Sequence, residues 1–353
     1  MKSTVYFVKV DTKSPEQRIS ALNKLLEKIS PFLVYKKEEI IPVKVTIGDS
    51  ACVYHIHPEL MQCVVALIKT RGAKPFLFDT NVIYKGQRQN ALDYLNLVES
   101  KGFGHSKVGA PFVIADGLLG QDGKEYDIKG ANIQKIKIPT FIGMLESLVV
   151  LSHATGHMVS GFAGAIKNVA MGMSCRSTKQ VQHSSLKPSV IAKTCTACAK
   201  CMAICPVNAI SWRNEKAFIE QGKCIGCGEC ICACKFDAIF INWGEDSLVF
   251  SKRMVEVAHF ILSKFRNKFF ITFAFDITKE CDCISGKGEQ MIASDLGILA
   301  SSDIVSLDKA AMDLALQHKA ISYFKDKRSV VEETLSYAQG MGLGSLEYDL
   351  FEV

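Results

Sequence analysis

The sequence predicts an α/β fold, in which a mixed or parallel sheet domain is interrupted by a small, cysteine-rich α+β domain. Three observations support this prediction. Short apolar runs alternate with helical patterns up to about residue 190, the same alternation resumes after residue 245, and the segment between them carries eight regularly spaced cysteines. A chain of 353 residues with 48% hydrophobic composition is also long enough for two or three compact units.

The N-terminal segment contains a strand signal followed by a helix signal. Residues 5–10 form a short apolar run that predicts a strand. Ser14 and Pro15 then supply an N-cap and a proline suited to the first helical turn. Apolar residues follow at the spacing of one helix face, at Ile19, Leu22, Leu26 and Ile29. We therefore expect an amphipathic helix after the first strand.

Further strands and helices are predicted up to residue 138. One helix should run from Pro58 to Gly72, because glycine readily adopts the left-handed conformation that ends a helix. Another is expected at residues 91–100. Strands are predicted at residues 43–47, 75–79, 111–115 and 133–138. In sheets of this kind, ligands tend to bind where the strands end.

The α/β pattern returns after the cysteine-rich segment. A helix is predicted at residues 251–264, a buried strand at 269–275 and another helix at 308–317. We interpret the chain as one α/β domain, residues 1–190 and 246–353, with an inserted unit at residues 191–245. A separate third domain after residue 245 is the alternative.

The inserted segment carries the same cysteine motif twice. The spacing C-x2-C-x2-C-x3-C occurs at Cys195, Cys198, Cys201 and Cys205, and again at Cys224, Cys227, Cys230 and Cys234. This resembles a bacterial ferredoxin with two 4Fe-4S clusters, in which the fourth cysteine of each run ligates the other cluster. The resemblance implies one cluster on Cys195, Cys198, Cys201 and Cys234, and a second on Cys224, Cys227, Cys230 and Cys205.

Two features of the second run depart from the ferredoxin pattern. Lys235 replaces the usual proline after the fourth cysteine, and Cys232 adds a thiol inside the run. We interpret Cys232 as a buried free thiol rather than a substitute ligand. Thiolates match soft iron, and structural zinc on the same sulfurs is the alternative.

A second informative segment covers residues 152–183. It is rich in glycine and polar residues, too polar for an ordinary core, which favours a chain that lines a site. His153 and His157 are candidate acid or base residues, and Lys167 and Lys179 are candidates for holding a small anionic substrate. Structural histidines and solvated lysines are the alternatives.

A third metal site is a further hypothesis. Cys175 and His183 from this segment, together with Cys281 and Cys283, would form a Cys3His set. Such a set would suit zinc, iron or another cluster. Cys281 and Cys283 could instead be a redox-active pair, or thiols that bind no metal.

These segments resemble one known family across almost the whole chain. The CDC sequence at residues 281–283, the ferredoxin insertion and the segments at 79–91, 114–120 and 295–303 are similar to the family called domain of unknown function 362. The resemblance implies an α/β domain of poorly defined activity joined to a two-cluster ferredoxin.

We therefore expect an iron-sulfur protein that transfers single electrons from an external redox partner protein to a redox or metal site in the α/β domain. Such a protein would be an iron-sulfur oxidoreductase. A non-enzymatic electron carrier or adaptor and a metallocentre assembly protein are the alternatives. Clusters of low potential suit reduction reactions, which predicts an anaerobic source.

Composition argues against two other classes of protein. The net charge of +6 comes from lysines spread along the chain without a dense basic block, which argues against nucleic-acid binding. The first residues lack the apolar stretch of a signal peptide, and no run of 18 or more apolar residues predicts a membrane span. We therefore expect no membrane association and a cytoplasmic location.

Overall fold

The computed structural model describes most of the chain. The described residues are 2–10, 13–84, 86–183, 187–224, 228–236, 238–240, 247–283, 286–317 and 321–353. Cys227, which the sequence predicts as a cluster ligand, lies outside them. Among the described residues, no helix is long and apolar enough to cross a membrane.

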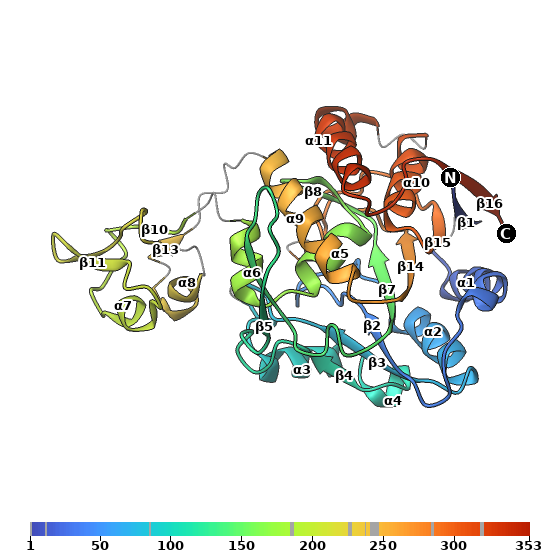
Figure 1. The fold of residues 1–353 in the computed structure, drawn as a ribbon, viewed down its shortest axis with the longest axis horizontal. Helices are drawn as coiled ribbons and strands as arrows, with labels where there is room; N and C mark the ends of the chain where they lie inside the picture. The colour runs from blue at the N-terminus through green and yellow to red at the C-terminus, as the bar shows by residue number, and fades with distance from the viewer. Residues whose placement is uncertain are drawn as a thin grey trace.

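One mixed sheet of eight strands forms the centre of the larger part of the molecule (Figure 1). Its strand order is β16-β1-β15-β14-β7-β2-β3-β4. The five strands from β14 to β4 run parallel, whereas β15 is antiparallel to both of its neighbours. The predicted α/β fold is confirmed. The strands are β1 (Ser3–Lys9), β2 (Ile40–Lys44), β3 (Lys74–Asp79), β4 (Phe112–Ile114), β7 (Ser147–His153), β14 (Asn267–Ala274), β15 (Gly297–Ser301) and β16 (Tyr348–Glu352).

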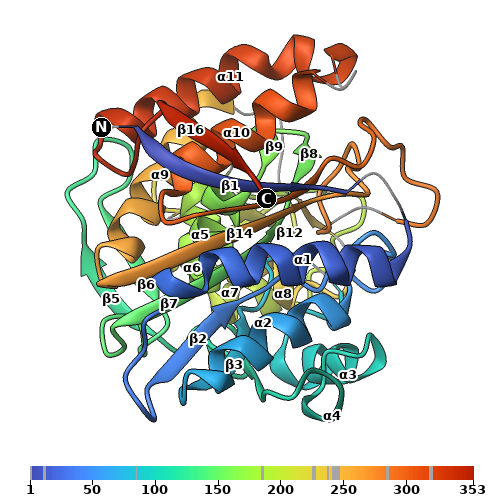
Figure 2. The same ribbon diagram turned by 90° about the vertical axis from the view of Figure 1, so that its right-hand side faces the viewer.

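Helices cover both faces of this sheet, as Figure 2 shows. Alternate strand residues enter two separate cores: Leu77 faces one and its neighbour Phe78 the other. The first core contains α1 (Pro15–Ile29), α2 (Pro58–Thr70) and α3 (Ala91–Ser100), with α4 (His105–Val108) beside them. The second contains α5 (Ala165–Gly172), α9 (Ser247–Leu262), α10 (Ile304–Gln317) and α11 (Ile321–Gly340).

Local sequence signals explain the first helix. The Ser14 side chain accepts a hydrogen bond from the Gln17 backbone N–H at 3.4 Å, and Pro15 opens the helix. The buried face contains Leu22, Leu25, Leu26 and Ile29. A single turn of 3-10 helix, η1 (Ser30–Phe32), follows. Burial of this apolar face against the sheet stabilises the helix more than its intrinsic propensity does.

Several elements differ from their predicted limits. The strand expected at 43–47 occupies Ile40–Lys44, and the helix expected from Asp308 begins at Ile304. Asp303 explains the earlier start, because its Oδ1 accepts the N–H groups of Val305 at 2.9 Å and Ser306 at 3.0 Å. The prediction did not include β7, β15, β16 or α11.

A smaller group of elements lies beside α6 (Arg176–Gln182), apart from the sheet (Figure 1). It has its own apolar cluster, which includes Ile210, Ile219 and four cysteines. Its elements are β10 (Ser189–Val190), α7 (Lys200–Ile204), β11 (Ile210–Arg213), β12 (Lys216–Ile219), α8 (Glu229–Ala233) and β13 (Ile239–Phe240). Two short hairpins complete the fold, β5 (Lys124–Asp127) with β6 (Lys135–Ile138), and β8 (Thr155–His157) with β9 (Gly161–Ala163).

Gly297, the first residue of β15, is expected to tolerate no side chain. Its φ is +150°, and a Cβ at this position would overlap the carbonyl oxygen of Val8 on the neighbouring strand. We expect Gly297→Ala to lower the free energy of unfolding by about 3 kcal/mol. Urea denaturation followed by circular dichroism measures this. Gly340→Ala is the matched control, since nothing lies within 4 Å of its added Cβ. Equal stability of the two variants would contradict the prediction.

Candidate functional site

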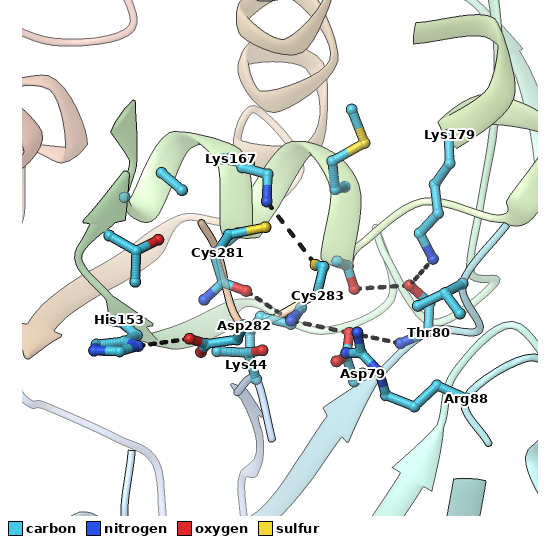
Figure 3. Close-up of a pocket in the computed structure, with 18 residues that line it drawn as sticks. Lys44, Asp79, Thr80, Arg88, His153, Lys167, Lys179, Cys281, Asp282 and Cys283 are labelled. Carbon is cyan, nitrogen blue, oxygen red and sulfur yellow. Dashed lines mark hydrogen bonds and ion pairs between the residues drawn. The ribbon is translucent and has the colours of Figure 1, made fainter. Parts of the chain in front are cut away.

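A cavity of about 90 Å³ lies at the carboxyl ends of adjacent parallel strands (Figure 3). Lys44 ends β2, Asp79 ends β3 and His153 ends β7. The loop after β14 supplies Cys281, Asp282 and Cys283. The carboxyl ends of parallel strands are where open α/β sheets bind ligands. Pairing of β7 with β14 brings together residues more than a hundred positions apart in the chain.

A buried ion pair forms one wall of the cavity. Lys44 Nζ lies 3.1 Å from Asp79 Oδ1 and donates a hydrogen bond of 2.7 Å to Asn168 Oδ1. The Tyr94 hydroxyl donates to Asp79 Oδ2 at 2.6 Å. Burial raises the pKa of Asp79, but Lys44 and other cations outweigh this, so that its pKa is lowered. Gly172 makes room for the Lys44 side chain, which an added Cβ would meet.

His153 holds a proton on both ring nitrogens. Nδ1 lies 2.7 Å from Asp282 Oδ1, and Nε2 lies 2.7 Å from the carbonyl oxygen of Phe275. Both neighbours are acceptors, so each nitrogen is a donor and the ring is an imidazolium. Burial lowers the pKa of His153, but the Asp282 carboxylate more than offsets this and the pKa is raised. The ring is thereby held in an ion pair with Asp282, which disfavours the neutral form that a general base requires.

Two thiols face an ammonium group inside the cavity. Lys167 Nζ lies 4.0 Å from Cys283 Sγ, and Figure 3 shows it pointing toward both sulfurs. A hydrogen bond from Cys281 holds the pKa of Cys283 well below its usual range, with Lys167 and Arg88 contributing. The same bond raises the pKa of Cys281. These opposite directions favour the proton on Cys281 and the thiolate form of Cys283.

Lys179 reaches the other end of the cavity from α6. Its Nζ donates to Thr80 Oγ1 at 2.6 Å and to the carbonyl oxygen of Asn81. Burial is the largest influence on the pKa of Lys179 and lowers it, although Asp116 and Asp79 oppose the effect. Lys167 and Lys179, the two lysines that the sequence predicts as anion ligands, thus both line the cavity.

His157 and His183 lie outside the cavity and have structural contacts. His157 Nδ1 accepts the N–H of Ser160 at 3.0 Å, and the imidazole ring stacks on Phe250 at a centroid distance of 6.0 Å. The His183 ring packs on the same phenylalanine at 4.5 Å. Burial lowers the pKa of His183 to about 3 and also lowers that of His157. Both rings are therefore neutral and pack against Phe250.

Cys175 is also directed away from Cys281 and Cys283. It lies at the start of α6, where its N–H donates to the carbonyl oxygen of Lys137 at 3.1 Å and its thiol donates to that of Asp122 at 3.6 Å. The expected convergence of Cys175, His183, Cys281 and Cys283 does not occur. Throughout the described ranges, no three His, Cys, Asp or Glu side chains are grouped to hold a single metal ion. Hydrogen bonds to Lys137 and Asp122 hold Cys175 elsewhere, and packing on Phe250 does the same for His183.

The ferredoxin-like cysteines line two small cavities. Cys195, Cys198, Cys201 and Cys234 line the first, and Cys205, Cys224 and Cys230 line the second. Equivalent backbone N–H groups, from Ala209 and Ala238, donate to Cys205 Sγ at 3.2 Å and Cys234 Sγ at 3.3 Å. A cluster needs thiolates around a space and N–H donors to its sulfurs. Among the described residues, each cavity is lined by cysteines of one run and by the fourth cysteine of the other, an arrangement that suits an iron-sulfur cluster.

Several cavity residues were missed by sequence reasoning. Lys44, Arg88 and Asp282 were not selected as candidates, although Arg88 lies in a segment that carries the family resemblance. Lys44 lay inside the strand predicted at residues 43–47, so the sequence did not indicate its position at a strand end. No local pattern reveals that Asp282 pairs with His153, because 129 positions separate them.

Curated relatives match only a short part of the chain. "Putative electron transport protein YsaA" of Escherichia coli is 46% identical over 41 residues, which is 12% of this chain and 26% of that relative. A putative iron-sulfur subunit of a dimethyl sulfoxide reductase from Halobacterium salinarum is 41% identical over 48 residues, 13% of this chain and 18% of the relative. The matched part is thus about a quarter or less of each relative's length.

Two solved structures are similar at low sequence identity. A structural-genomics crystal structure from Thermotoga maritima has a TM-score of 0.44 and 9% identity, covering 93% of this chain and 61% of that one. The lactate racemase apoprotein from Thermoanaerobacterium thermosaccharolyticum has a TM-score of 0.40 and 11% identity, covering 86% and 55%. At these scores the similarity carries no statement about function.

A family model matches a much longer part of the chain. The model described as Domain of unknown function (DUF362) covers residues 41–313, which include every residue of the cavity and all eight ferredoxin-like cysteines. More than half of the 353 residues are matched. The chain therefore belongs to the family Domain of unknown function (DUF362).

Proposed function

We propose that this chain is an iron-sulfur protein that holds two 4Fe-4S clusters and transfers single electrons to the α/β cavity. The observation that carries the proposal is the crossed cysteine lining of the two small cavities. Each cluster would supply a group that accepts and releases one electron at a time. Cys195, Cys198, Cys201 and Cys234 would hold one cluster, and Cys205, Cys224, Cys227 and Cys230 the other.

The position of α6 supports a direction for electron transfer. Gly228 lines the second cysteine cavity, and a Cβ built on it would lie 3.0 Å from Gln180 Oε1 in α6. The preceding residue of that helix, Lys179, lines the α/β cavity. The second cluster would therefore adjoin the α/β part of the molecule. Cys198, which is exposed, would place the first cluster near solvent, where an external redox partner protein could approach.

The names of the short relatives agree with this proposal. One is named for electron transport and another as an iron-sulfur subunit. The α/β cavity, with the thiols of Cys281 and Cys283, is the proposed destination of the electrons. In the alternative, an electron carrier or adaptor, those thiols would have only a structural role.

Metal analysis after anaerobic purification tests the proposal. We expect about eight irons and eight sulfides per chain, with zinc near zero. The Cys281→Ser/Cys283→Ser variant should keep both clusters, because these sulfurs face Lys167 and not the cluster cavities. Stoichiometric zinc in place of iron, or fewer than about six irons after full reconstitution, would contradict the two-cluster proposal. Loss of a labile metal in the variant would favour the metallocentre assembly alternative instead.

A further inference from the structure

We infer that the α/β cavity is a binding site for a small carboxylate or inorganic oxyanion, held between Lys167 and Lys179 with the thiols of Cys281 and Cys283 beside it. The inference rests on the proposed function only for the statement that electrons reach this ligand. The binding site itself is built entirely from residues of the α/β part.

Some charged side chains around the cavity have an oppositely charged partner, and others do not. Lys44 lies 3.1 Å from Asp79, His153 lies 2.7 Å from Asp282, and Arg88 Nε lies 3.6 Å from Asp49 Oδ2. In the described part of the chain, neither Lys167 nor Lys179 has a carboxylate within 4.0 Å. Asp116 acts on Lys179 from a greater distance, and one of its oxygens is already bound by Asn81.

Two ammonium groups without carboxylate partners favour an anionic ligand. Removing a charge from water is unfavourable unless an opposite charge or several hydrogen bonds replace the lost hydration. Lys179 is 5% exposed and has neutral acceptors for two of its three N–H groups. Lys167 has the thiol pair as its partner. An anion would supply the opposite charge that Lys179 lacks, and Lys167 would hold it beside the thiols.

Polar atoms in the cavity wall point to the same ligand chemistry. Among the described residues, the buried Thr155 Oγ1 has no hydrogen-bond partner, whereas Arg88 Nε faces Asp49 Oδ2 at 3.6 Å. Both residues line the cavity. The Thr155 hydroxyl can donate a hydrogen bond to a carboxylate or oxyanion. Among the same described residues, Asp282 Oδ2 is also without a partner and would repel the anionic end, which places that end nearer Lys179.

The size of the cavity restricts the ligand. A volume of about 90 Å³ holds several water molecules, at roughly 10–15 Å³ each. Phosphate, sulfate or a carboxylate of a few carbons fits this space. The thiols adjoin the same space, so the ligand would lie beside Cys283.

Paired alkylating reagents test the inference on the anaerobic holoprotein. Iodoacetate and iodoacetamide form the same S–C bond and release the same iodide, but only iodoacetate is an anion. The ratio of their rates at one cysteine therefore reports the local charge and cancels the reactivity of the sulfur itself. We expect this ratio at Cys283, read by mass spectrometry, to exceed the ratio at Cys63 by about tenfold or more. Cys63 is the internal reference because it is half-buried on α2.

Substitution of one lysine localises the effect. Lys179→Met should lower the Cys283 ratio to that of Cys63, whereas Lys124→Met, at an exposed lysine of β5, should leave it unchanged. If Lys179→Met does not fold, protection experiments on the parent chain still test whether the cavity binds an anion. Oxalate or phosphate should slow modification of Cys283 by iodoacetamide, and neutral oxamide should not. Protection by oxalate alone identifies a carboxylate site, and protection by phosphate alone an oxyanion site.

An equal ratio at Cys283 and Cys63, or absence of protection by both anions, would overturn the inference. This outcome is separable from failure of the proposed function. Iron content reports the clusters, and alkylation of Cys283 reports the cavity. A chain with about eight irons and no anion selectivity would retain the first proposal and reject the second. A chain without iron but with anion selectivity would reject the two-cluster proposal and retain the anion-binding site.

Discussion

Replacement of Cys234 by alanine is expected to remove the cluster held by Cys195, Cys198 and Cys201, the cysteines of the other run. The four sulfurs line one cavity, although Cys234 follows the second cysteine run in sequence. Loss of one thiolate leaves an iron without its protein ligand, and we expect iron to fall from about eight to about four per chain. Iron and sulfide analysis, with electron paramagnetic resonance of the reduced protein, measures the loss.

The reciprocal substitution makes this prediction specific. Cys205→Ala should remove the cluster associated with Cys224 and Cys230 and leave the first one. Cys63→Ala is the matched control, since this thiol lies on α2 away from both cysteine cavities. If Cys234→Ala and Cys205→Ala abolished the same resonance, or if each removed the cluster of its own run, the crossed assignment would be wrong.

Asp282→Asn is expected to have the largest effect on the stability of the α/β part. The substitution removes the anion at Nδ1, so the buried His153 ring must either stay charged without a partner or lose its proton. Removing one member of a buried ion pair typically lowers stability by about 3–5 kcal/mol. Urea denaturation near neutral pH measures the difference. Asp127→Asn, at an exposed carboxylate of β5, is the matched control and should be close to neutral.

The pH dependence of stability should reverse in sign in this variant. In the parent, Asp282 raises the folded-state pKa of His153 above its unfolded value of about 6.5, with Phe275 and Asp276 assisting. The contribution of His153 is therefore complete below about pH 6.5 and is lost as the pH rises through the folded-state pKa. The pKa of Asp282 is lowered by His153, His55 and Lys167, so its contribution is lost only in acid.

Without the carboxylate, burial of His153 favours the neutral ring and its pKa falls below about 6.5. The contribution of His153 to the stability of Asp282→Asn should then increase as the pH rises toward about 6.5, whereas in the parent it should decrease as the pH rises above about 6.5. Urea unfolding midpoints of the parent and of Asp282→Asn, measured on both sides of about pH 6.5, test this prediction. Parallel pH profiles for the two chains would show that His153 is not held as an imidazolium by Asp282.

The elements with strong local signals were the ones that the sequence predicted. Ser14 and Pro15 mark the start of α1 because capping and proline geometry depend on adjacent residues. The cysteine spacing predicts a cluster unit for the same reason: three of four ligands lie within seven residues of one another. Strand β7, which is buried along its whole length, was not predicted although it lies at the centre of the sheet. Its apolar run at residues 148–151 is short and flanked by Ser147 and Ser152, a weaker local signal than the run at 269–275 that was predicted.

The candidate site was predicted only in part. His153, Lys167 and Lys179 were selected from a polar, glycine-rich segment and Cys281 and Cys283 as possible metal ligands, and all line the cavity. Cys175, His183 and His157 were selected on the same basis but lie elsewhere. Composition indicates which segment lines a site, but it does not indicate which way each side chain of that segment points.

By itself, the sequence determined that this protein has an α/β fold and carries a repeated cysteine motif of the ferredoxin type, because periodicity, capping and ligand spacing are properties of neighbouring residues. Only the tertiary structure decided which residues share the cavity. Lys44, Asp79, His153 and Asp282 meet because β2, β3, β7 and β14 are parallel neighbours. Strand order depends on burial of apolar faces across the whole chain, and no local segment encodes it.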